Sequence, residues 1–152
     1  MPELTVQNTW SLGPVTHRAN LGDLDLVQTA GGTVLYGTNG STGGLVSYAV
    51  NDSTGALSLI DSYTLPPLVS VDGPAHLETM SFGGQDFIVN LGRHADGLDA
   101  FQIDASADFD THVDLAGTDG SNISTLAYHS APNRDVVYAG YWGSSDLGIY
   151  QV

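Results

Sequence analysis

Six side chains whose chemistry suits ligand binding fall in or beside the predicted loops of this chain. They are His17, Arg18, His76, Arg93, His94 and Trp142. The set contains two of the three arginines and three of the five histidines in the sequence. Arginine binds anionic groups through paired hydrogen bonds, and an indole ring offers a flat face for stacking. The set therefore predicts a shallow pocket for an anionic or sugar-like ligand. The alternative is that these histidines occupy polar loop ends and bind nothing.

Two other chemistries use the same region. His17 and His76 have carboxylates near them in the sequence, as a calcium or zinc site would need: Asp23, Asp25, Asp72 and Glu78. No spacing matches a metal-binding motif, so neither a metal nor another cofactor is predicted. Lactone hydrolysis would need a base, for which Glu78 or His76 is a candidate, and an electrophile, for which Arg93 is one. There is no GxSxG nucleophile elbow, and the catalytic residues stay unassigned.

The elements that must position these side chains recur along the chain. A shift of 53 residues places Tyr48 on Phe101, and a further 49 residues places Phe101 on Tyr150. The first shift also places Asp25 on Glu78, which is more typical of a structural role, such as capping an amide, than of acid–base catalysis. Each unit contains alternating apolar segments separated by turns rich in Gly, Asn and Asp. A period near 50 residues with four strands per unit is typical of a β-propeller, in which each unit is one blade.

The predicted fold is therefore all-β, without helices: one domain over residues 1–152 that forms a three-bladed propeller segment. The blades are expected over 24–65, 76–115 and 123–152. The predicted strands are 24–30, 33–38, 45–50 and 57–65, then 76–82, 86–91, 98–103 and 109–115, and finally 123–129, 135–141 and 147–152. The third blade lacks its outermost strand. Residues 4–12 align with the outermost strand of the first blade and are expected to supply it, in the order D-ABCD-ABCD-ABC.

This strand order predicts self-association. Closed propellers normally need four or more blades, so three blades alone would leave sheet faces and strand edges exposed. Two copies would make a six-bladed ring, and two-fold dimers are the commonest homo-oligomers. In that ring, residues 4–12 complete the third blade of another copy. Three copies with nine blades, or a fragment of a longer propeller, remain open as alternatives.

The first unit resembles a known repeat. Its sequence, LYGTNGSTGGLVSYAVNDSTGALSLIDSYTLP over 35–66, is similar to the blade repeat of lactonase-like, YVTN-type β-propellers, above all in its Asn-Gly turn and in its turn over 52–55. The second unit has DASAD over 104–108 at the latter turn, and the third unit ends before it. The matched residues are turn and core positions, so the resemblance implies a scaffold and assigns no catalytic residue. Members of the wider group include lactone-hydrolysing enzymes and surface-layer or secreted binding proteins.

The charge balance excludes some partners. Fifteen Asp and two Glu face three Arg and no Lys, which gives a net charge of −14. Such a surface repels phosphate backbones and anionic lipids, so neither nucleic acid nor a membrane is an expected partner. The excess of carboxylates is interpreted as a solubility device for a salty or extracellular setting. Calcium loading is the alternative, although neither an EF-hand loop nor a GGxGxD repeat is present.

Other classes are excluded by what the sequence lacks. There is no cysteine, hence no disulfide, no thiolate catalysis and no cysteine-based zinc site. No run of 18 apolar residues is present, and the first residues do not have the pattern of a signal peptide. The predicted function is a non-catalytic propeller that binds a ligand or a partner within a secreted or cell-surface protein. A lactonase-like hydrolase with its site at the channel mouth is the alternative.

Overall fold

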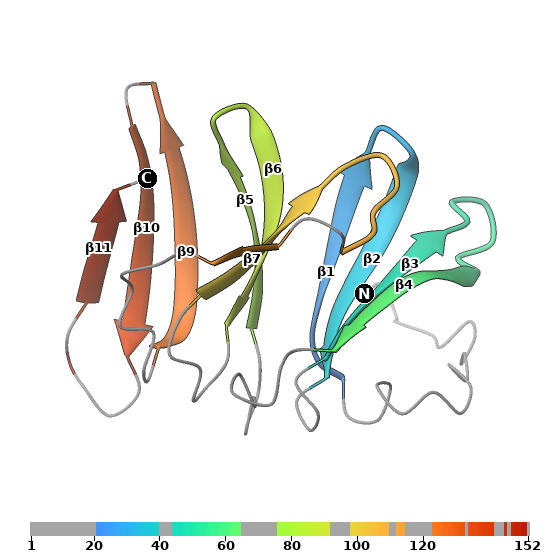
Figure 1. The fold of residues 1–152 in the computed structure, drawn as a ribbon, viewed down its shortest axis with the longest axis horizontal. Coiled ribbons are helices and arrows are strands. Elements are labelled where there is room, and N and C mark those ends of the chain that lie inside the picture. Colours follow the sequence, from blue (N-terminus) through green and yellow to red (C-terminus); the bar gives the residue numbers. More distant parts are fainter. Residues whose placement is uncertain are drawn as a thin grey trace, which may run out of the picture.

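The computed structural model of this chain is built from strands alone in the part that it describes (Figure 1). That part comprises residues 21–39, 44–64, 76–91, 98–109, 112–114, 123–132, 134–141, 145 and 147–151. It contains eleven strands, which form three antiparallel sheets. The all-β class predicted from the sequence is confirmed. No helix long and apolar enough to cross a membrane occurs among these residues.

Each sheet is a meander of consecutive strands. The first sheet has the order β1 (Leu21–Thr29), β2 (Gly32–Asn39), β3 (Gly44–Val50) and β4 (Leu57–Thr64). The second has the order β5 (His76–Phe82), β6 (Gln85–Leu91), β7 (Leu98–Ile103) and β8 (His112–Asp114). The third contains β9 (Ile123–Ala131), β10 (Arg134–Tyr141) and β11 (Leu147–Gln151). The predicted strand at 4–12 lies outside the described residues.

The sequence repeat is also a repeat of strand register. The second and third strands of each sheet pair at equivalent residues: Leu35 with Tyr48, Ile88 with Phe101, and Val137 with Tyr150. The first and second strands do the same: Leu26 with Leu35, Thr79 with Ile88, and Tyr128 with Val137. The shifts of 53 and 49 residues found in the sequence therefore hold in the hydrogen-bonded ladders.

The sheets pack face to face in a row, and the second sheet has a neighbour on both sides (Figure 1). Successive side chains of a strand point to opposite faces, and β6 uses both. Ile88 packs against the first sheet, whereas Phe87 and Val89 pack against the third. The first strands of the sheets are also neighbours, since β5 contacts both β1 and β9. These two apolar clusters are the core of the described chain.

One predicted strand is shorter than expected. The sequence predicted a strand over 109–115, but β8 covers only His112–Asp114. Phe109 is buried in the first cluster, and its amide donates to Asp61 Oδ2 of β4 at 3.1 Å instead of joining its own sheet. The preceding turn is fixed by Asp104, whose carboxylate accepts the amides of Ser106 and Ala107 at 2.7 and 3.1 Å. The prediction was wrong at Phe109, where a contact with the neighbouring sheet replaces the ladder, and it was right for 112–114; residues 110, 111 and 115 lie outside the described residues.

Contact with this turn also constrains the hairpin between β1 and β2. A Cβ on Gly31 would lie 2.3 Å from the carbonyl oxygen of Ala105, so no larger residue fits there without a backbone shift. Ala107 has a φ of 57°, in the left-handed region that residues other than glycine rarely adopt, and its side chain is buried. The turn is therefore a packed part of the interface between the first two sheets.

The outer faces of the row carry exposed apolar side chains. Leu24 and Leu26 of β1 are 50% and 61% exposed, and Leu147 and Ile149 of β11 are 62% and 66% exposed. Among the described residues, no further sheet covers these positions, and the three sheets form an open row rather than a closed ring (Figure 1). An apolar face of this kind usually marks a surface that meets another element or another chain.

Phe101 tests the register of the repeat. Its ring is fully buried. The centroid of this ring lies 4.9 Å from that of Tyr63 and 5.5 Å from that of Phe109, and both pairs have edge-on geometry. We expect Phe101→Ala to lower the free energy of unfolding by about 3–5 kcal/mol, as loss of a buried phenyl ring does. Urea denaturation measures the change. The control, Leu59→Ala at a half-exposed position on β4, should cost much less. An equal cost for both would show that Phe101 is not a core anchor. Tyr48, at the equivalent position of the first sheet, is also buried, and the side chain of Tyr150 lies outside the described residues.

Candidate functional site

His76 is the one predicted site residue that the structure describes. It begins β5, next to the innermost strand of the first sheet. The other five predicted site residues lie outside the described residues: His17, Arg18, Arg93, His94 and Trp142. The predicted gathering of cationic groups on one rim therefore stays a prediction, and the site is built from His76 outward.

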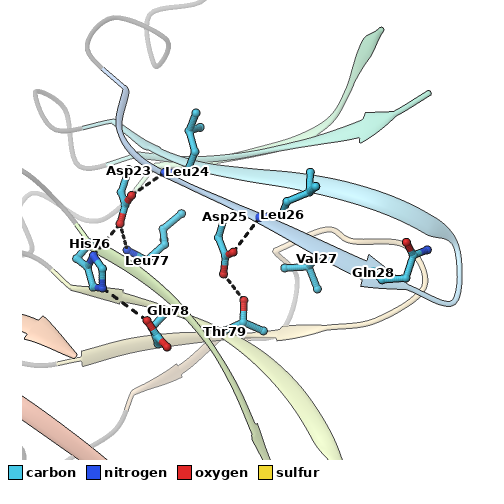
Figure 2. Close-up of a pocket in the computed structure, with 10 residues that line it drawn as sticks. All are labelled: Asp23, Leu24, Asp25, Leu26, Val27, Gln28, His76, Leu77, Glu78 and Thr79. Carbon is cyan, nitrogen blue, oxygen red and sulfur yellow. Dashed lines mark hydrogen bonds and ion pairs between the residues drawn. The ribbon is translucent and has the colours of Figure 1, made fainter. Parts of the chain in front are cut away.

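His76 joins two carboxylates from different strands (Figure 2). Its Nδ1 lies 2.7 Å from Asp23 Oδ2 of β1, and its Nε2 lies 3.6 Å from Glu78 Oε2 two residues further along β5. All three side chains are about one-third exposed. The imidazole therefore sits in an Asp–His–Glu row that spans two sheets and is open to solvent.

Asp23 connects the first sheet to the second. Its Oδ1 accepts the amide of Leu24 at 2.9 Å, and its Oδ2 accepts the amide of Leu77 on β5 at 3.0 Å. Its own amide donates to the buried hydroxyl of Thr38 at 3.0 Å. The free edge of β1 has amides that no strand of its own sheet can use, and a carboxylate satisfies them where a neutral side chain would not. Asp23 therefore links the two sheets through backbone hydrogen bonds in addition to its contact with His76.

Asp25 repeats this arrangement two residues later. Its Oδ1 accepts the amide of Leu26 at 2.8 Å, and its Oδ2 accepts a hydrogen bond from the hydroxyl of Thr79 on β5. The sequence suggested that the position shared by Asp25 and Glu78 caps an amide, and Asp25 does so. Glu78 does not, because among the described residues its carboxylate is paired only with His76.

Glu78 is the carboxylate whose protonation is perturbed. Partial burial raises its pKa above the ordinary value, and the negative charges of Asp25 and Asp23 act in the same direction. His76 opposes them through its charge and its hydrogen bond, but the net pKa is still raised. A carboxyl group with a raised pKa beside an imidazole is the kind of pair that can transfer protons near neutral pH. The pair also has a purely structural explanation, because ion-pair networks perturb pKa values too.

An open groove of about 490 Å³ runs along β1 and β5 beside this row. Its wall combines carboxylates, one imidazole, hydroxyl and amide groups with aliphatic side chains (Figure 2). The lining residues are Asp23, Leu24, Asp25, Leu26, Val27, Gln28, His76, Leu77, Glu78 and Thr79. Such a wall can accept hydrogen bonds from hydroxyl or ammonium groups. No arginine is among the described residues that line it, so an anion would need the cationic residues predicted on the neighbouring loops.

The residues that the sequence singled out for a metal do not form a site in the described part of the chain. Within these ranges there is no group of three His, Asp or Glu side chains placed to hold an ion. Asp23 and Asp25 use their oxygens on amides and on Thr79 instead. His17 and Asp72, which completed the predicted set, lie outside the described residues.

Comparison with known proteins adds no family to this picture. A scan against protein-family models, a search of curated proteins and a search of solved structures found no match for the chain. The resemblance to lactonase-like propellers therefore remains a prediction from the repeat sequence.

Sequence reasoning missed the role of Asp23 and Thr79. The signal for Asp23 was present, since the shift of 53 residues places Asp23 on His76, and inner strands of adjacent units are expected to be neighbours. Pairing equivalent positions across units would have joined these two side chains. Nothing local marks Thr79, because its partner Asp25 is 54 residues away in the chain.

Glu78 and Asp104 give opposite predictions for the pH dependence of stability. The raised pKa of Glu78 means that the folded state binds its proton more tightly than the unfolded state, so its ionisation costs stability once the pH exceeds its ordinary pKa. Glu78→Gln should therefore raise the free energy of unfolding at pH 7, and this gain should shrink as the pH falls and wild-type Glu78 becomes protonated.

The matched control is Asp104→Asn. Hydrogen bonds from the hydroxyl and amide of Ser106, followed by that of Ala107, lower the Asp104 pKa, so its ionised form stabilises the fold. Removing that charge should lower the free energy of unfolding at pH 7, and the loss should disappear as the pH falls through the lowered pKa. Urea denaturation between about pH 2 and 7.5 measures both variants, because the loss for Asp104→Asn should disappear only below the ordinary pKa of an aspartate. If Glu78→Gln instead destabilises the protein at pH 7, the favourable interaction of the Glu78 carboxylate with His76 outweighs the cost of partly burying its charge.

Proposed function

We propose that this chain is a β-propeller segment that serves as a non-catalytic binding module in a secreted or cell-surface protein. One observation carries the proposal: three consecutive sheets share one strand register, pack face to face, and bring their first strands together. Propeller blades pack in this way, with the first strand of each blade nearest the central channel. In this arrangement the groove along β1 and β5 opens toward the channel.

The same proposal includes self-association. Three blades leave two sheet faces free, and a second copy of the chain would supply three more blades and complete a six-bladed ring. A two-fold assembly is the simplest closed form of that contact. Three copies, or further blades from a longer chain, are the competing ways to close the ring.

The ligand that suits the groove is polyhydroxylated, with an anionic group where the predicted cationic rim would meet it. Carboxylates accept hydrogen bonds from sugar hydroxyls, and Val27 in the groove wall provides apolar surface. Arg93 and Arg18 would pair with the anion, and Trp142 would stack on a sugar ring. A sugar acid combines these features.

A lactone hydrolase is the second candidate, and Glu78 is the observation that favours it. A carboxyl with a raised pKa next to His76 in an open groove has the components of a general base that activates water. Three of the four oxygens of Asp23 and Asp25 accept backbone amides and the fourth accepts Thr79, which leaves Glu78 as the carboxylate available for chemistry.

The assembly is tested by mass in solution. We expect light scattering to give twice the mass of one chain, because two half-rings bury each other's free faces. Deleting residues 1–12 should expose the edge of β11 and cause aggregation or loss of the assembly, since these residues are predicted to pair there. A truncated protein that stays folded, soluble and unchanged in mass would contradict the predicted role of this segment.

The ligand is tested by titration with sugar acids, the corresponding lactones and sulfate. Arg93→Ala should weaken binding about tenfold or more, as loss of a charge-assisted hydrogen bond does. Arg134→Ala is the control with the same charge change. Arg134 is exposed at the start of β10, beside the hairpin with β9, whereas the predicted rim residue Trp142 follows the other end of this strand. Equal effects of the two variants would argue against a site at the rim. Hydrolysis of a lactone that Glu78→Gln abolishes would favour the enzyme instead.

A further inference from the structure

The contact between the first two sheets shows how an inner strand meets the next one. β1 lies beside β5, and the hydroxyl of Thr79 donates to Asp25 Oδ2. On the same pair of strands, the amide of Leu77 donates to Asp23. Residues 23 and 25 of one sheet therefore face residues 77 and 79 of the next.

The repeat converts this contact into an expectation for the two free faces. The register places Thr79 at the position of Leu26 in the first sheet, and it places Asp25 at the position of Ala127 in the third. If a third sheet met a first sheet as the first meets the second, Leu26 would lie against Ala127. Likewise, Leu24 would lie against Thr125.

Both residues of this expected contact are apolar, whereas the equivalent residues inside the chain are polar. Where Asp25 meets Thr79 inside the chain, the pair is polar and hydrogen-bonded. At the equivalent positions of the free faces, Leu26 is apolar and 61% exposed, and Ala127 is small, apolar and exposed. An unpaired carboxylate opposite Leu26 would be costly to bury, and the third sheet has none at that position. The two free faces are therefore complementary to each other.

On the first sheet's free face, the exposed apolar side chains are Leu24 and Leu26 of β1, together with Leu59 of β4. On β3 of the same sheet, Val46 and Tyr48 are already buried within the chain. The third sheet offers exposed β9 side chains at 125, 127 and 129, together with Leu147 and Ile149 of β11. The contact is thus centred on the inner strands, where β1·β5 and β5·β9 already meet inside the chain.

We infer that β1 of one copy packs beside β9 of a second copy, with Leu26 against Ala127 of the second copy. This inference rests on the proposed self-association and adds the surface and the register of the contact. Each contact joins two different faces, and the two-fold axis repeats it with Ala127 of the first copy against Leu26 of the second, so two such contacts close a ring of two chains. The occupant of the free face is thus another copy of this chain.

The charge of the chain gives this contact a salt dependence. Each copy carries a net charge of −14, so two copies repel each other at long range. Salt shortens the screening length to about 10 Å at 0.1 M, whereas the apolar contact itself is not weakened by screening. Association should therefore strengthen as sodium chloride is raised from about 0.01 to 1 M, the opposite of an interface held by ion pairs.

Disulfide cross-linking tests the register, because the natural chain has no cysteine. Leu26→Cys and Ala127→Cys are made as separate single variants, mixed, and oxidised with diamide. A disulfide needs Cα atoms within about 7 Å, which only adjacent strands provide. The mixture should give a covalent dimer on a denaturing gel, and each variant alone should give little. The control is the mixture of Leu26→Cys with Ser58→Cys, at an exposed position on β4, which should give no more dimer than Leu26→Cys alone.

A charged substitution at Leu26 tests whether this surface is required for self-association. Leu26→Asp should reduce the mass in solution to that of one chain while the circular dichroism spectrum keeps its strand signal, whereas Ser58→Asp should leave the assembly intact. A dimeric wild type without the 26–127 cross-link would overturn this interface and leave self-association standing. A monomeric wild type at 1 M salt would overturn both. In a further variant that carries both Leu26→Cys and Ala127→Cys, oxidation should give a covalent dimer, and a ladder of larger cross-linked oligomers would overturn the two-chain closure.

Discussion

The structure depends on sheets that are apolar on both faces. A sheet of this kind must be covered twice, and only the second sheet of the described chain is: Ile88 packs to one side, and Phe87 and Val89 pack to the other. The first and third sheets each have one covered face and one face with exposed leucine or isoleucine. Among the described residues, the first and third sheets therefore each keep an apolar face that no other sheet covers, and a face of this kind usually meets another element or another chain.

Aspartates hold the sheets together at their edges, in the same way at both ends of the first sheet. At the inner edge, Asp23 accepts the amide of the next residue with one oxygen and the amide of Leu77 with the other. At the outer edge, Asp61 accepts the amide of Ser62 and that of Phe109. Part of the excess of carboxylates thus satisfies free edge amides and links neighbouring sheets, which blunts edges that could otherwise pair with other chains. Some of the carboxylates behind the strongly acidic composition therefore have a structural role.

Strand positions and register were predictable because they depend on local alternation and on a repeat that is visible in one sequence. Contacts between sheets were less predictable, since they join residues about 50 positions apart. The prediction for β8 was wrong because Phe109 leaves its own ladder to reach Asp61 and the first core cluster. At the site, the place of His76 at the start of a strand was predicted and is confirmed, whereas its role in ligand binding stays a prediction. To predict its partner Asp23, one would have had to combine the repeat with the expectation that the first strands of adjacent sheets are neighbours. The cationic rim depends on loop geometry, which alternation and turn residues do not determine.

Assembly and site chemistry are linked through Glu78. Its pKa is already raised, chiefly because it is partly removed from water in an open groove. In a closed ring the same groove would face a narrow channel, and the lower dielectric would raise that pKa further. The higher its pKa, the higher the pH up to which a carboxyl keeps its proton, and a protonated carboxyl donates a hydrogen bond to a bound oxygen and cannot act as a base. Closing the ring would therefore suit recognition of a hydroxylated ligand, as in the proposed binding module, better than base catalysis by Glu78.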